Sequence, residues 1–100
     1  MNKLIKYFTY TPVVNRGLIS SKTEKHEFIC KLSEEVNEVY EAHTFDNKLS
    51  DHEAEEIMDV IFVCLNYLIH YNRSIIKEFF KVYKKNKKRS RCKLRTNINR

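Results

Sequence analysis

Apolar residues recur three or four positions apart along much of the chain, which is the spacing of an amphipathic helix. The first long stripe predicts a helix from about Ser21 to about His43. Its start is marked by Ser21-x-x-Glu24, a spacing typical of the capping box that satisfies free backbone N–H groups. The apolar positions of this helix are Phe28, Leu32, Val36 and Val39.

A second stripe predicts a helix that begins with the capping box Ser50-x-x-Glu53 and runs to about Tyr71. It is apolar on almost all sides. One face comprises Ile57, Ile61, Leu65 and Leu68, and the opposite face comprises Glu56, Asp59, Val63 and Asn66. We therefore expect the first face in the core and the second along a polar seam.

The two ends of the chain are predicted from weaker patterns. Ser74 can cap a third long helix that continues into a basic run and points Ile75, Phe79, Val82 and Tyr83 inward. A short N-terminal helix should end at or before Thr11, because Pro12 restricts the preceding residue and lacks an N–H group. An irregular connector is expected from Thr11 to Ser20.

The predicted fold class is all-α, an antiparallel bundle of about four helices that oligomerisation completes. One Gly and one Pro in 100 residues suit long helices rather than a turn-rich β fold. The whole of residues 1–100 is expected to form a single domain. Within it, residues 1–20 hold the N-terminal helix and connector, and residues 84–100 form a basic C-terminal segment.

Cysteine usage and hydropathy favour a cytoplasmic protein without a membrane segment. The three cysteines have no CxxC spacing, which argues against a disulfide framework. The apolar run from Val60 to Ile69 is interrupted by Asn66 and is about half as long as a membrane span requires. The first ten residues lack the continuous apolar region of an export signal.

Charge is unevenly distributed. Residues 81–100 carry six Lys, four Arg and no acid, a local charge of +10 against +6 for the whole chain, which leaves −4 for residues 1–80. Such a basic segment can contact nucleic acid, contact the phosphates of a substrate, or remain solvated.

Two pairs of carboxylates carry the candidate chemistry. Glu35 with Glu38, and Glu56 with Asp59, are each spaced three residues apart, so each pair lies on one side of its helix. A short link between the helices makes them antiparallel neighbours and can bring the pairs face to face. Carboxylates so close repel unless a cation bridges them, and oxygen ligands suit Mg²⁺, with Mn²⁺ as a substitute.

Two other metal sites are disfavoured. Di-iron bundles need a Glu-x-x-His pair, and no histidine of this chain has a Glu three positions before it. No Cys/His spacing resembles a zinc site.

KLSEEVNEVYEA followed by EAEEIMDVIFVCLNYL resembles the core of the MazG-like, all-α nucleoside triphosphate pyrophosphohydrolases. The family signature E-E-x-x-E, a spacer and E-x-x-D corresponds to Glu34, Glu35, Glu38, Glu56 and Asp59. The resemblance covers about residues 24–91 and includes a basic stretch after the last core helix. In two departures, Asn37 stands where many members have Gly, and the chain has no Trp to stack on a base.

The resemblance implies an enzyme that cleaves a (d)NTP between the α and β phosphates, giving a monophosphate and pyrophosphate. The four carboxylates Glu35, Glu38, Glu56 and Asp59 would hold Mg²⁺, and Glu35 or Glu38 would activate water. Substrate contacts are expected from Lys31, Asn66, Lys84, Asn86, Lys88 and Arg91. An alternative for Asn66 is a buried amide bonded to a neighbouring helix.

Assembly is expected because so few helices cannot cover a helix that is apolar almost all round. We predict a homo-oligomer, a dimer or tetramer, as is common in the family. Two rival functions belong to other classes: a nucleic-acid-binding module acting through the basic tail, which is possible but not favoured, and a non-catalytic regulatory bundle.

Overall fold

The part of the chain that the structure describes, residues 1–89 of a computed structural model, is entirely α-helical apart from its connections. Its helices are α1 (Asn2–Thr9), α2 (Thr11–Asn15), α3 (Lys25–Ala42), α4 (Asp51–His70) and α5 (Ile75–Arg89). The all-α prediction is confirmed. No helix in residues 1–89 is long and apolar enough to cross a membrane.

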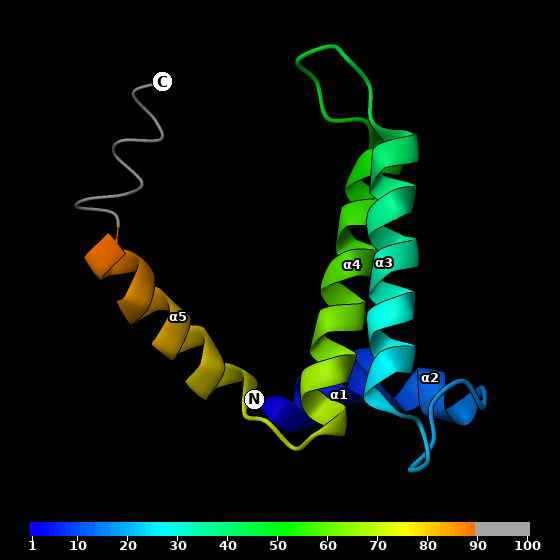
Figure 1. The fold of residues 1–100 in the computed structure, drawn as a ribbon, viewed down its shortest axis with the longest axis vertical. Coiled ribbons are helices and arrows are strands. Elements are labelled where there is room, and N and C mark those ends of the chain that lie inside the picture. Colours follow the sequence, from blue (N-terminus) through cyan, green and yellow to red (C-terminus); the bar gives the residue numbers. More distant parts are fainter. Residues whose placement is uncertain (90–100) are drawn as a thin grey trace.

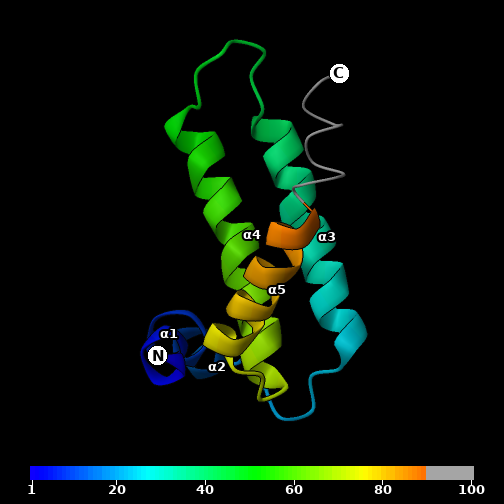
Figure 2. The same cartoon turned by 90° about the vertical axis from the view of Figure 1, so that its left-hand side faces the viewer.

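The centre of the fold is an antiparallel hairpin of α3 and α4, joined by the loop of residues 43–50 (Figures 1 and 2). Its best-packed layer lies near the end remote from this loop, where the Phe28 ring stacks on Tyr67 with centroids 4.9 Å apart. Few apolar side chains are buried: among the described residues they are Ile19, Phe28, Ala42 and Ile69.

The start of α3 differs from the prediction. The cap is Glu24 rather than Ser21, and a reciprocal capping box joins Glu24 to Glu27, whose Oε2 accepts from the Glu24 N–H at 2.6 Å. The start of α4 is confirmed, since Ser50 Oγ accepts a hydrogen bond from the Glu53 N–H at 3.1 Å.

The N-terminal segment is more helical than predicted. Helix α1 ends at Thr9 as expected, but Pro12 lies in the first turn of α2. Proline is tolerated there, because N–H groups in the first turn of a helix make no hydrogen bond within the helix. The irregular connector therefore begins after Asn15. His70 holds this segment on α4: its Nδ1 accepts from the Tyr10 hydroxyl at 2.8 Å, and its Nε2 donates to the Thr23 carbonyl at 3.1 Å.

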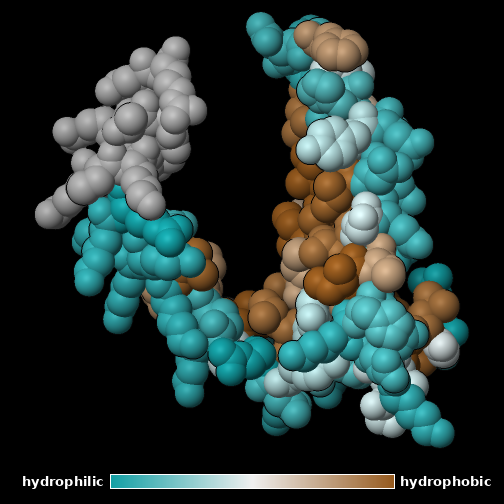
Figure 3. Space-filling view, in the orientation of Figure 1, coloured by the Kyte–Doolittle hydropathy of each residue, from teal (hydrophilic) through white to brown (hydrophobic). Residues whose placement is uncertain are grey.

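Helix α5 leaves the hairpin at a steep angle and touches it near its own start (Figure 1). The prediction that its apolar side points inward is wrong for the single chain, because Phe79 is 62% exposed and Tyr83 is 54% exposed. One chain therefore does not complete a four-helix bundle. An apolar surface over α4 also faces the space between the hairpin and α5 (Figure 3).

The two serines at the predicted caps provide a matched test of this local structure. Ser50→Ala should lower the free energy of unfolding by about 1 kcal/mol, because it leaves the Glu53 N–H without its acceptor. Ser21→Ala should change it by less than about 0.5 kcal/mol, since Ser21 is exposed and caps nothing. Urea denaturation followed by circular dichroism measures both; equal losses would contradict the assignment of the caps.

Candidate functional site

Three carboxylates converge where α3 faces α4. One oxygen each from Glu35, Glu38 and Glu56 lies within 4.8 Å of the other two. Glu35 and Glu38 are one turn apart on α3, and the antiparallel course of α4 brings Glu56 opposite them. The two acidic motifs were predicted to lie opposite each other, and these three of their residues do so.

Two oxygens of this cluster are buried without a hydrogen-bond partner. Glu35 is only 7% exposed; its Oε1 accepts from Lys31 Nζ at 2.8 Å, whereas its Oε2 has no partner. Glu56 Oε2 is likewise buried and unpartnered, although His52 Nδ1 lies 3.8 Å from its Oε1. An unpaired buried carboxylate oxygen is costly, and either a cation or a proton carried by the neighbouring Glu38 carboxyl would reduce this cost.

The close approach of these carboxylates changes the protonation of the cluster. The pKa of Glu38 is raised to about 7, chiefly by a hydrogen bond shared with Glu56, then by a hydrogen bond and charge repulsion from Glu35. The pKa of Asp59 is also raised, first by desolvation and then by the charges of Glu35 and Glu56. The pKa of Lys31 is raised by its hydrogen bond to Glu35. The neighbouring carboxylate charges contribute to all three pKa shifts without being the largest cause of any of them.

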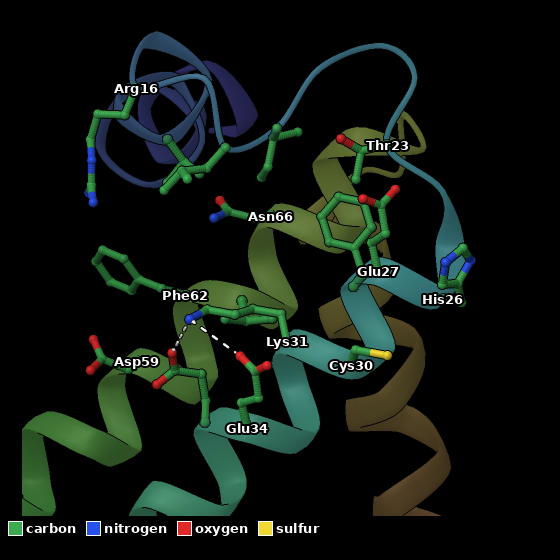
Figure 4. Close-up of a pocket in the computed structure, with 16 residues that line it drawn as sticks. Arg16, Thr23, His26, Glu27, Cys30, Lys31, Glu34, Asp59, Phe62 and Asn66 are labelled. Atoms are coloured by element: carbon green, nitrogen blue, oxygen red, sulfur yellow. Dashed lines mark ion pairs between the residues drawn. The ribbon is translucent and has the colours of Figure 1, made fainter.

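A cavity of about 660 Å³ adjoins the cluster, between the hairpin and the N-terminal segment (Figure 4). Three predicted site residues line it besides Glu35, namely Lys31, Asp59 and Asn66. Asp59 is exposed and stands outside the three-carboxylate cluster. Asn66 is 6% exposed and its Oδ1 has no hydrogen-bond partner, so the alternative of an amide bonded to a neighbouring helix is not what the structure contains.

The predicted contacts from the basic segment do not reach this cavity within one chain. Lys84, Asn86 and Lys88 lie on α5, and none of them lines it. Asn86 instead borders an apolar groove between α4 and α5, together with Phe79 and Tyr83. Arg91 lies outside the described residues.

The N-terminal segment supplies residues that the sequence interpretation missed. Val13, Arg16, Leu18 and Ile19 line the cavity from the side opposite the carboxylates. The segment precedes the region of family resemblance and carries no acidic motif or regular stripe, so no local signal marked Arg16 as a site residue.

The carboxylate cluster fits a hard divalent cation. Its donors are all oxygen, two of them are buried and unpaired, and no cysteine belongs to the cluster. Comparison with protein-family models, with curated proteins and with solved structures finds no significant match to this chain.

The raised pKa of Glu38 predicts how pH affects stability. Between its usual value of 4.5 and about 7, folded Glu38 holds a proton that the unfolded chain releases. The free energy of unfolding of the metal-free protein should therefore contain a contribution that falls as pH rises through this window. Added Mg²⁺ should restore stability above about pH 7, where Glu38 is largely ionised.

Thermal unfolding of wild type and Glu38→Gln across this window measures the effect. The decline should be smaller in the variant, in which the raised pKa of Asp59 remains, and Glu41→Gln, an exposed acid on the same helix, should retain it in full. Superimposable pH profiles for wild type and Glu38→Gln would refute the assignment.

Proposed function

We propose that this protein is a Mg²⁺-dependent pyrophosphohydrolase of nucleoside triphosphates, yielding a monophosphate and pyrophosphate. The observation that carries the proposal is the cluster of Glu35, Glu38 and Glu56, with two buried unpaired oxygens, at the edge of a cavity of about 660 Å³. A cavity of this size is typical of a small-molecule site. The resemblance of the two acidic motifs to the MazG-like family agrees with it.

The buried carboxylates hold the cation in this proposal. Glu35 and Glu56 present the unpaired oxygens, and Asp59 stands beside them at the cavity wall. Lys31 fixes Glu35 through its 2.8 Å contact and keeps the second oxygen free for binding. The cation, when bound, neutralises charge that develops on the phosphate oxygens.

Glu38 is the member best placed to accept a proton from water. It is exposed, whereas Glu35 is buried and bound to Lys31. Hydrogen bonds to Glu56 and Glu35 and the charge of Glu35 raise its pKa to about 7 in the metal-free protein, and a carboxylate with a raised pKa is a stronger base toward water. Water that gives a proton to this carboxylate forms a new P–O bond at the anhydride between the α and β phosphates, the bridging P–O bond breaks, and monophosphate and pyrophosphate separate.

A second copy of the chain is the proposed cover for the apolar faces of α4 and α5. The exposed side chains on these faces are large: Ile57, Met58, Ile61, Phe62, Ile76, Phe79, Phe80, Val82 and Tyr83 are each at least 36% exposed. Such a surface is typical of an interface. We assign phosphate contacts to Lys84, Asn86 and Lys88 only within such an assembly.

Pyrophosphate release from a panel of NTPs and dNTPs tests the activity. Asp59→Asn and Glu56→Gln should each reduce the Mg²⁺-dependent rate by about a hundredfold, the scale of losing one electrostatic group at a phosphate centre. Glu55→Gln is the matched control, because Glu55 is exposed and stands outside the cluster. No release by folded wild type, with salt-dependent binding of DNA or RNA instead, would favour the nucleic-acid-binding alternative.

Light scattering tests the assembly. Wild type at micromolar concentration should be at least dimeric, and Ile61→Lys should dissociate it, because a charge cannot be buried unpaired in an apolar contact. Asn47→Lys adds the same charge in the exposed loop between α3 and α4 and should leave the mass unchanged. A wild-type monomer would exclude the proposed assembly.

A further inference from the structure

Helix α1 packs on the hairpin with one side and exposes large apolar side chains on the other. Thr9 is buried and Ile5 is half-buried where α1 meets α4. On the other side, Leu4, Tyr7 and Phe8 lie within one turn of one another and are 61%, 65% and 63% exposed. We call these three side chains the α1 face. Among residues 1–89, nothing shields the α1 face from solvent.

The charges on the N-terminal segment are all positive. Residues 1–23 carry four basic residues and no acid, and two of the basic residues, Lys3 and Lys6, are exposed on α1 itself. Residues 24–72, which include the hairpin, carry three lysines and twelve acids, a net charge of −9. The positive segment lies at one end of the negative hairpin (Figure 2). An anionic surface would therefore attract α1, repel the hairpin and orient the molecule.

The composition of α1 matches a helix that lies in the plane of a membrane surface. Such helices place aromatic and aliphatic side chains at the boundary between headgroups and acyl chains and keep lysines on the polar side. Leu4 and Phe8 provide the apolar groups, and Tyr7 adds a ring whose hydroxyl can stay among the headgroups. The flexible stems of Lys3 and Lys6 let their ammonium groups reach lipid phosphates.

The surface assigned above to a second copy of the chain does not include α1. That surface consists of side chains on α4 and α5, and it borders the space between the hairpin and α5 (Figure 3). The α1 face is thus still exposed to solvent when the proposed contact between copies is made.

We propose that α1 is an interfacial anchor for an anionic phospholipid bilayer. The α1 face enters the headgroup layer, Lys3 and Lys6 contact lipid phosphates, and the acidic hairpin extends away from the bilayer. This attachment requires no membrane-spanning helix, and it is independent of the proposed activity.

Vesicle flotation with the full chain tests the anchor. The protein should bind vesicles of phosphatidylcholine that contain about one-third phosphatidylserine, less strongly as salt is raised, and should not bind phosphatidylcholine alone. Phe8→Ser should weaken binding about tenfold by removing a ring from the apolar layer. Phe45→Ser is the matched control, because Phe45 is 99% exposed in the loop at the other end of the hairpin.

The electrostatic part of the contact has its own matched pair. Lys3→Gln should weaken binding to the anionic vesicles about fivefold, since one cation near the lipid surface is lost. Lys48→Gln removes an exposed cation from the loop between α3 and α4 and should leave binding unchanged. Equal losses in the two variants would mean that net charge alone drives binding, and would overturn the anchor.

A fluorescent reporter shows which helix enters the bilayer. The chain has no tryptophan, so one introduced indole is a unique probe. The emission of Phe8→Trp should move to shorter wavelength on anionic vesicles and be quenched by brominated acyl chains, whereas that of Phe45→Trp should not change. Phe80→Trp reports on the exposed stripe of α5. A response from Phe80→Trp without one from Phe8→Trp would place the contact on α5 and contradict the proposal.

Two further outcomes would also overturn the anchor. The first is the absence of binding to anionic vesicles by folded wild type. The second is a loss of oligomer mass in Phe8→Ser by light scattering, which would assign the α1 face to a contact between copies of the chain. Circular dichroism of every variant should match that of wild type, because each substituted side chain is exposed.

Discussion

The antiparallel contact of α3 with α4 brings carboxylates of both helices within 4.8 Å of one another, and the surrounding structure responds to this repulsion. The helical repeat places Glu35 and Glu38 on the side of α3 that meets α4. Packing of the two helices therefore also concentrates negative charge. Lys31 offsets part of the repulsion by binding Glu35 at 2.8 Å. In the metal-free protein the repulsion that remains favours a proton on Glu38. In the proposed active form a cation takes the place of this proton.

Features that depend on one or two helical turns could be predicted from the sequence. The three long helices follow from apolar periodicity, and the converging carboxylates follow from their spacing of three residues. The start of α3 could not be fixed in this way, because the helix is capped by Glu24, whereas Ser21 is the residue type that favours a cap. The choice depends on the preceding turn, in which the Ser20 N–H donates to Thr23 Oγ1 at 2.9 Å.

Features that depend on distant contacts could not be predicted. The N-terminal segment lies over the cavity because His70 forms hydrogen bonds to both Tyr10 and Thr23. These residues are 60 and 47 positions away from His70 in the sequence. No local pattern encodes that bridge, so the place of Arg16 was missed. The apolar stripe of α5 has the same periodicity whether its own hairpin or another molecule covers it, which is why its inward orientation was wrongly expected.

The direction of α5 depends on the opposite end of the chain. The Asn2 side chain donates to the Arg73 carbonyl at 2.8 Å and accepts from the Ile75 N–H at 2.9 Å. A single amide group therefore binds both the turn before α5 and the first N–H group of α5, which has no partner within the helix. A change at the first residues, such as an affinity tag or proteolytic trimming, is therefore transmitted to the orientation of α5. Preparations that differ only there would hold the hydrophobic stripe of α5 in different orientations relative to the hairpin.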